Sequence, residues 1–261
     1  MPKILNLDYD IEVAADSMKL GQPLEIAYPK LKKSRFSDSR RDLKHALNWM
    51  WLGTHKGVSH QETVQTVRQI VSRSLAFYDV LGWDSSRDEH DYVITNAAIL
   101  IGDQELLAKV LMRISVADQT DEQNNYWRAL TGILKFMLAG DQVRVRQQFQ
   151  MRCLCKGKMT PTRTPKKTTL KVFIDGNAKS LQRQVKTLTE NCWNIVREYN
   201  LPTVQKREGD CDIKLKLGIC DALNYWPWPE AAILKLMAQN GANFDTDEFW
   251  LPKILIKPTN S

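Results

Sequence analysis

The sequence predicts an all-α fold of stacked antiparallel helical hairpins. Apolar residues recur at spacings of three and four along most of the chain, which is the pattern of amphipathic helices. Two Gly-Asp-Gln turns, at residues 102–104 and 140–142, each follow an apolar helix end. Glycine is common just beyond a helix C-terminus, and aspartate is a good N-cap for the next helix. Each turn therefore predicts a tight hairpin of two helices.

The spacing of these two turns raises the question of a repeat. They lie 38 residues apart, which is within the range of helix–turn–helix repeats. The residues around the two turns match poorly, so a helical-repeat fold and a non-repetitive helical domain both stay open. The turns themselves are predicted to be structural in either case.

The chain is predicted to contain one folded domain after an irregular start. Residues 1–36 predict an irregular N-terminal segment, because Gly21, Pro23 and Pro29 favour turns. Residues 37–261 predict a single α-helical domain, whose length allows a sizeable core.

Several helices of this domain have recognisable starts or stripes. Ser59 and Glu62 form a capping-box pattern that opens a helix running to Leu81. An earlier helix is predicted at residues 41–52 from one apolar stripe, with the members Leu43, Ala46, Leu47, Met50 and Trp51.

The second half of the chain predicts two more helices and, at most, one short strand. Residues 178–199 predict a helix, and Pro229 stands in the first turn of another that runs to Gln239. A short strand or an extended entry is predicted near residues 168–174, because three apolar residues alternate there: Leu170, Val172 and Ile174.

The composition is that of a globular protein, with 43% hydrophobic and 26% charged residues among 261. No apolar stretch approaches the roughly 20 residues that a membrane-spanning helix needs. Acidic residues occupy the N-terminus where a signal peptide has an apolar stretch, so we expect a cytoplasmic protein. Five cysteines, none in a C-x-x-C pattern, are expected to be reduced thiols: Cys153, Cys155, Cys192, Cys211 and Cys220.

Positive charge is concentrated in one stretch of the chain. The whole chain has a formal net charge of +7. Residues 142–207 contain fifteen Lys and Arg against Asp175, Glu190 and Glu198, so this stretch carries +12 and the rest of the chain −5. Two interpretations stay open: solvated helix faces with a mobile basic loop, or an electropositive docking face for an anionic partner.

A basic loop is predicted at residues 156–169, where the sequence KGKMTPTRTPKKTT has two prolines and almost no apolar anchor. If the positive stretch is a docking face, seven side chains are candidates for partner binding: Arg144, Arg152, Lys156, Lys158, Arg163, Lys166 and Lys167. Aromatic residues are sparse in the same stretch, so stacking on single-stranded nucleic acid has little support.

No catalytic or metal-binding pattern stands out, and we predict a protein that is not an enzyme and holds no cofactor or metal. Acidic residues near the predicted turns are expected to act as N-caps and first-turn acids, with an acid–base pair or a metal site as the alternative: Asp84, Asp88, Glu89, Asp91, Asp118, Asp121 and Glu122. The eight tryptophans are expected to pack between helices, with binding anchors as the alternative.

The end of the chain carries a family resemblance. Trp226-Pro-Trp228-Pro-Glu-Ala-Ala and Asp245-Thr-Asp247-Glu-Phe-Trp-Leu251-Pro252 occur there, after Trp-bearing helices and Gly-Asp turns. Across about residues 40–256 this combination resembles the immunity proteins of bacterial polymorphic toxin systems, and most of all immunity-protein family 49. The resemblance implies a mostly helical protein, encoded beside the toxin that it neutralises. The family has no short motif that places toxin-contact residues on this chain.

The sequence therefore predicts an immunity protein that binds a cognate protein toxin and occludes its active site. The positive stretch differs from the acidity of antitoxins that mimic nucleic acid, and it favours a toxin with an anionic rim around its active site. The alternative function is that of a helical-repeat nucleic-acid-binding or adaptor protein that uses the basic residues at 142–207.

Overall fold

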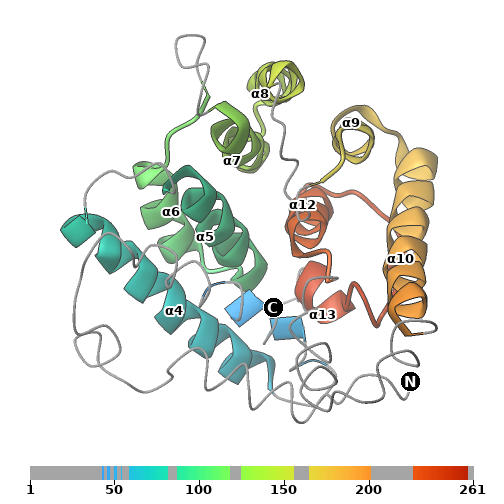
Figure 1. Ribbon diagram of the computed structural model, residues 1–261, viewed down its shortest axis with the longest axis horizontal. Coiled ribbons are helices and arrows are strands. Elements are labelled where there is room, and N and C mark those ends of the chain that lie inside the picture. Colours follow the sequence, from blue (N-terminus) through green and yellow to red (C-terminus); the bar gives the residue numbers. More distant parts are fainter. Residues whose placement is uncertain are drawn as a thin grey trace, which may run out of the picture.

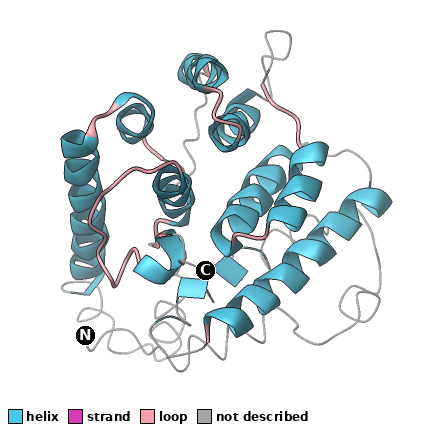
Figure 2. Cartoon of the chain, turned by 180° about the vertical axis from the view of Figure 1, so that it is seen from behind, coloured by secondary structure: helices cyan, strands magenta, loops and turns pink. Residues whose placement is uncertain are grey.

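The regular elements of the described chain are all α-helices (Figure 1). The computed structural model describes residues 59–81, 87–117, 125–155, 165–200 and 226–257, together with Leu43, Ala46, Leu47, Met50, Trp51 and Thr54. No strand occurs in these residues, as Figure 2 also shows. The predicted all-α fold is therefore confirmed, whereas the segment predicted at residues 1–36 lies outside the described part. The helices are α4 (His60–Leu81), α5 (Arg87–Ile101), α6 (Gln104–Arg113), α7 (Asn125–Leu138), α8 (Gln142–Leu154), α9 (Lys167–Asp175), α10 (Ala178–Asn200), α12 (Trp228–Gln239) and α13 (Lys253–Ile256).

Helices that follow one another in the chain pack against each other. α4 packs on α5, α5 on α6, α7 on α8 and α9 on α10. α12 lies in the middle of the molecule, where it contacts α5, α7, α9 and α13 (Figure 1). Helices α4 to α6 therefore form one side of the molecule and α9 and α10 the other. Among the described helices, none has both the length and the apolar character that crossing a membrane requires.

The boundaries predicted for α4 and α12 are confirmed. Ser59 accepts a hydrogen bond on Oγ from the backbone N–H of Glu62 (3.1 Å), as the capping-box pattern predicts, and α4 ends at Leu81. Pro229 lies in the first turn of α12, which ends at Gln239. Short-range sequence signals therefore place these helices correctly.

Both Gly-Asp turns have the predicted geometry. Gly102 and Gly140 have φ angles of +74° and +69°, in the left-handed region that glycine adopts without strain. Asp103 and Asp141 each cap the next helix by accepting a hydrogen bond from the backbone N–H three residues ahead, at 3.1 and 3.0 Å. In the second turn, the N–H of Asp141 also donates back to the carbonyl oxygen of Phe136 (2.9 Å). Each turn reverses the chain within a few residues.

The prediction of a short strand or an extended entry near residues 168–174 is wrong, because these residues form part of helix α9. The basic loop predicted at residues 156–169 is also shorter than expected, since α9 begins at Lys167; residues 156–164 lie outside the described part of the chain. The buried face of α9 has helical spacing and consists of Thr169, Leu170 and Phe173. The alternation of Leu170, Val172 and Ile174 leaves out Phe173. Phe173 is only 4% exposed, so α9 turns the face that carries Phe173 towards the core.

The apolar stripe predicted at residues 41–52 is part of the core. Its five apolar residues are helical and fully buried. The predicted packing role is confirmed for the described tryptophans: Trp51, Trp226, Trp228 and Trp250 are buried, and Trp127 and Trp193 are half-buried against the core. Trp49 and Trp83 lie outside the described residues.

Three tryptophans from distant parts of the chain stack in this core. The ring of Trp51 is nearly parallel to that of Trp250, with centroids 5.2 Å apart, and to that of Trp226, 6.4 Å away. Trp193 of α10 packs edge-on against Trp250 at 5.4 Å. These ring contacts therefore join the apolar stripe that contains Trp51, helix α10 and residues 226–257, which we call the C-terminal segment.

A buried lysine joins α12 to α5. Lys235 donates a hydrogen bond from Nζ to the carbonyl oxygen of Leu100 (2.5 Å), at the C-terminal end of α5. Burial lowers the pKa of Lys235 to about 8. Its positive charge faces the negative end of the α5 dipole, which stabilises it there. The Gly102 turn lies close by, since a Cβ on Gly102 would be 3.4 Å from Nζ.

Gly140→Val should lower the free energy of unfolding by about 1–2 kcal/mol, because valine disfavours a φ of +69°. A Cβ at this position meets no atom within 4 Å, so a side chain that begins there has open space and backbone strain is the main expected cause of the loss. Gly140→Asn is the matched control and should lose less, since asparagine tolerates the left-handed region. Urea unfolding followed by circular dichroism measures both variants. Equal losses for Val and Asn would contradict the expected role of backbone strain.

Candidate partner interface

α8 has a buried face and an exposed face, and the spacing of its residues explains both. Val145, Gln148 and Arg152 recur at helical spacing and are buried. α7 is the main neighbour of this helix, and α9 contacts it from another side. Arg144 and Arg146 fall outside the buried face and are exposed. The helix therefore presents charge to solvent while polar side chains hold it in place.

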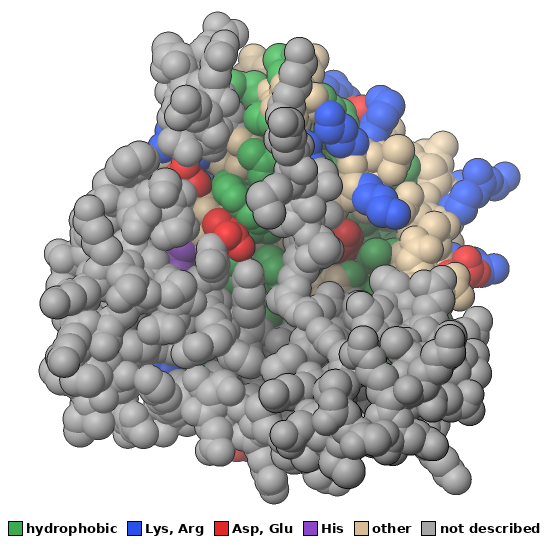
Figure 3. Space-filling view, viewed as in Figure 1, with side chains coloured by type: hydrophobic (Ala, Val, Ile, Leu, Met, Phe, Trp, Pro, Cys, Tyr) green, Lys and Arg blue, Asp and Glu red, His purple; other side chains and the backbone are tan. Residues whose placement is uncertain are grey.

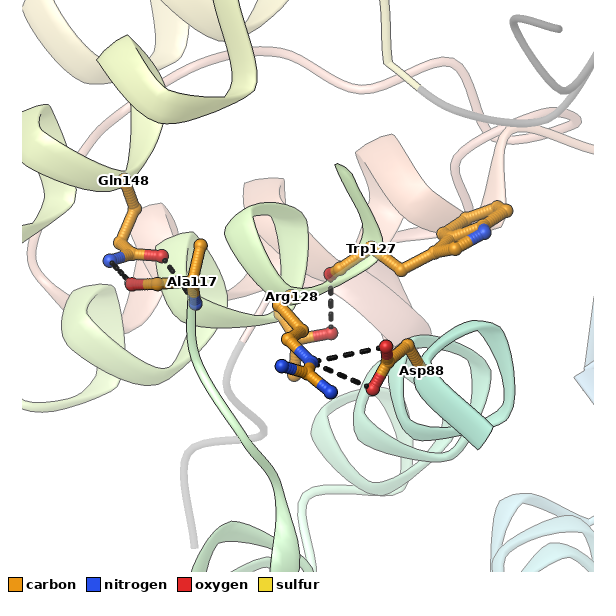
Figure 4. A network of polar contacts seen from close by, with 6 residues as sticks. Asp88, Ala117, Trp127, Arg128 and Gln148 are labelled. Atoms are coloured by element: carbon orange, nitrogen blue, oxygen red, sulfur yellow. Dashed lines mark hydrogen bonds and ion pairs between the residues drawn. The ribbon is translucent and has the colours of Figure 1, made fainter. Parts of the chain in front are cut away.

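Gln148 ties α8 to the segment that precedes α7. Its Nε2 donates to the carbonyl oxygen of Ala117 (2.9 Å), and its Oε1 accepts from the N–H of Ala117 (3.2 Å) (Figure 4). Both backbone groups of a buried residue thereby have partners. Gly132 on α7 makes this approach possible, because a Cβ there would clash with the Gln148 side chain.

Arg152 was expected among the partner-binding residues, but it lies in the interior. Only 3% of the residue is exposed. Its Nη2 donates to the hydroxyl oxygen of Tyr126 (3.0 Å), and its guanidinium lies 4.1 Å from the centre of the same ring. Arg152 follows Val145 by two helical turns, which places it on the buried face of α8. In the folded protein it supports α8 and does not contribute to an exposed interface.

Figure 3 shows Lys and Arg side chains gathered on the part of the molecule where α8, α9 and α10 lie. We call the exposed basic residues of these helices, with Lys166 just before α9, the basic surface: Arg144, Arg146, Lys166, Lys167, Lys171, Lys179, Arg183 and Lys186. Among the side chains described between residues 141 and 194, the acidic ones are Asp141, Asp175 and Glu190. The basic surface therefore keeps a large excess of positive charge.

Ion pairs hold part of the basic surface in a defined geometry. Asp175, at the end of α9, lies 3.1 Å from Arg146 Nε of α8 and 3.3 Å from Lys171 Nζ. Burial alone would raise the pKa of Asp175, but the hydrogen bonds from Arg146 and Lys171 lower it below its usual value. The carboxylate therefore stays charged and connects α8 with α9.

The predicted partner-binding residues are only partly brought together. Arg144, Lys166 and Lys167 lie on the basic surface, whereas Lys156, Lys158 and Arg163 lie outside the described residues. The prediction did not include five members of the surface: Arg146, Lys171, Lys179, Arg183 and Lys186. The spacing of three and four residues within α10 was a signal that could have found three of them.

A second group of charged side chains is buried between α5 and α7. Nε of Arg128 lies 3.1 Å from both carboxylate oxygens of Asp88 (Figure 4). Asp91, one turn later, is 2% exposed, and burial raises its pKa to about 8, although the charge of Arg128 opposes the shift. The prediction that Asp88 and Glu89 lie in the first turn of a helix is confirmed. Asp88 and Asp91, however, belong to the interior and not to a solvated helix end.

The remaining predicted acids, Asp84, Asp118, Asp121 and Glu122, lie outside the described residues. Within the described residues, no three His, Cys, Asp or Glu side chains gather as metal ligands would, and Cys153, Cys155 and Cys192 are free thiols. The basic surface can bind anions, because Lys and Arg offer several charged N–H donors each. No protein-family model matches the chain, and no similar protein was found among curated proteins or solved structures.

Asp91→Asn should change the pH dependence of stability. Folding raises the pKa of Asp91 from 3.8 to about 8, so between these values the folded protein holds a proton that the unfolded chain releases. The free energy of unfolding of the wild type should therefore fall as the pH rises from about 4 to 8, and it should fall more than that of the variant. Urea unfolding at about pH 5 and about pH 8 measures the difference.

Asp175→Asn is the control for this comparison. The pKa of Asp175 is lowered in the folded protein from its usual 3.8, so its contribution to stability is lost only as the pH falls below about 5 and stays constant at all higher pH values. The control should therefore keep the pH dependence of the wild type. The same pH dependence for Asp91→Asn would show that burial does not shift the pKa of Asp91.

Proposed function

We propose that the protein is a non-enzymatic immunity protein, which binds a cognate protein toxin in the cytoplasm and occludes the active site of that toxin. The observation that carries the proposal is the basic surface on α8, α9 and α10. Its natural partner is an anionic surface, such as an acidic rim around an active site. The class of partner is taken from the resemblance of the sequence to immunity-protein family 49.

The way in which the basic surface is held supports binding without rearrangement. Its residues lie on helices whose opposite faces are buried, and the contact of Arg146 with Asp175 links two of these helices. A preformed surface has little conformational entropy left to lose when it binds. Tight inhibition of a toxin depends on such a surface.

Unpaired charges on the surface support fast encounter with the partner. Lys166, Lys179 and Arg183 make no ion pair with any residue that the structure describes. Exposed charges of one sign accelerate association with a partner of the opposite sign, over a range of roughly 8 Å at physiological salt. A host that must intercept a toxin quickly benefits from this acceleration.

Nucleic-acid binding is a second candidate function, because the eight side chains of the basic surface also suit a phosphate backbone. The aromatic side chains of the same region are not free to stack on bases: Phe173 is 4% exposed, and Phe149 and Trp193 pack partly against the core. Only phosphate contacts would remain. The protein partner is therefore the better supported of the two.

The product of the gene adjacent to this one is the partner to test. Co-expression of this chain should restore the growth of cells that produce the adjacent protein, and the two proteins should stay bound at high salt. A short DNA duplex should bind weakly and lose affinity steeply with salt, as counterion release requires. Failure to protect cells and to form a complex with the adjacent protein would contradict the proposed function.

Charge reversal on the basic surface should slow association with that partner. Lys179→Glu with Arg183→Glu should reduce the association rate several-fold at low ionic strength, and the difference should shrink as salt screens the charges. Both residues are exposed, so folding should be almost unchanged. Stopped-flow mixing at several salt concentrations measures the rates.

The control for this variant has the same change of charge elsewhere on the molecule. Lys109→Glu with Lys253→Glu alters two exposed lysines of α6 and α13, whose ion pairs with Glu105 and Glu248 are exposed and contribute little to stability. The control should associate at a rate closer to that of the wild type. If both double variants slow association equally, net charge and not the basic surface controls encounter.

A further inference from the structure

The outer face of α8 combines exposed apolar side chains with positive flanks. Four large apolar side chains among the described residues are exposed, and two of the three most exposed lie on α8: Val143 at 67% and Leu154 at 77%. They are eleven residues apart, which is close to three helical turns, so they lie in one line along the helix axis. The rise of an α-helix separates them by about 16 Å. Gln147 and Gln150 lie between them on the same face and are also exposed.

Two arginines border this line of residues on opposite sides. At 100° per residue, Arg144 falls on one side of the line through Val143 and Leu154, and Arg146 falls on the other. Arg144 lies 3.4 Å from Asp141 and stacks over the ring of Phe136 at 5.3 Å. Arg146 lies 3.1 Å from Asp175, so each of the two arginines forms an exposed ion pair beside the apolar line.

No part of the described chain covers this face. The opposite face of α8 is buried, mainly against α7, and the contact with α9 runs along the side that carries Arg146. We call the outer face the α8 ridge. Its crest carries an apolar side chain at each end, Val143 and Leu154, with Gln147 and Gln150 between them, and its two slopes carry Arg144 and Arg146.

We propose that the α8 ridge inserts into a cleft of the partner protein whose floor is apolar and whose walls are acidic. This inference rests on the proposed function and names the element that occludes the partner's active site. Arg144 and Arg146 on the slopes complement acidic walls in charge, Val143 and Leu154 complement an apolar floor, and the amides of Gln147 and Gln150 can form hydrogen bonds between them. Nucleic acid fits the ridge less well, because a phosphate backbone offers the two apolar side chains nothing to pack against.

The two kinds of side chain have different tasks in this arrangement. Exposed charges guide the approach and are worth little once the complex has formed, whereas apolar groups that become buried in the cleft keep the complex together. Removing the apolar groups should therefore change the dissociation rate and leave the association rate unchanged. A change in the dissociation rate alone therefore reports the apolar groups of the ridge, whereas a change in the association rate reports the exposed charges of the basic surface.

The test truncates the two apolar side chains of the crest without changing charge. Val143→Ala with Leu154→Ala should dissociate from the product of the adjacent gene about tenfold faster than the wild type, with the same association rate. Met112→Ala is the matched control, because Met112 is 80% exposed on α6, away from the ridge. The control should dissociate at the wild-type rate. Alanine favours helix, so the double variant should keep its fold, which circular dichroism checks.

Hydrogen exchange provides a second readout that needs no substitution. Amides of α8 should gain protection in the complex, whereas those of α6 should not. If the complex forms but the double variant dissociates like the control and α8 gains no protection, the inference about the ridge is wrong and the proposed function stands. If the adjacent protein does not bind at all and a short DNA duplex does, the proposed function fails, and the ridge as a protein-docking element fails with it.

Discussion

The stacking of Trp51, Trp226 and Trp250 is the contact on which the rest of the structure depends. Its geometry is fixed by polar groups as well as by ring contact: Trp51 Nε1 donates to the carbonyl oxygen of Phe249 (2.5 Å), and Trp226 Nε1 donates to that of Trp250 (3.0 Å). Buried indole rings cover much apolar surface, and residues 249 and 250 of the C-terminal segment supply the acceptors for the N–H groups of Trp51 and Trp226, whereas the buried N–H of Trp250 has no hydrogen-bond partner among the described residues. The stack holds this segment between the two sides of the molecule, so that α12 can contact helices from both.

A series of ring contacts leads from α12 to the helix that carries the proposed ridge. Trp228 packs against Tyr92 of α5 with centroids 5.9 Å apart, and Tyr92 packs against Trp127 of α7 at 5.4 Å. α7 then supports α8 through the contact of Tyr126 with Arg152 and the close approach of Gln148 to Gly132. Close-packed interiors deform little, so the core beneath α8 fixes the position of this helix.

The features that could be predicted from the sequence depend on residues close together in the chain. The capping residue Ser59 and the turn glycines Gly102 and Gly140 act within one helical turn, so local rules were sufficient. The burial of Arg152 and Asp91 depends on which helix packs over them, and a single sequence does not contain that information. In α9 the local pattern was ambiguous, because a short apolar run fits strand and helix alike until its packing is known. The basic surface was predicted as a charged stretch, but its exposed members follow from the packing of α8, α9 and α10.

The hydrogen bond from Trp51 to Phe249 joins residues that are 198 positions apart, which has a consequence for the synthesis of the protein. On the ribosome, most of the helices emerge before the segment that completes the core. Contacts between distant residues form late, because closing a long loop costs chain entropy. Until residues 226–257 have been translated, the apolar stripe around Trp51 lacks its cover and is open to chaperones and proteases. A chain that ends before residue 226 therefore keeps this apolar stripe without the contacts of Trp226, Phe249 and Trp250.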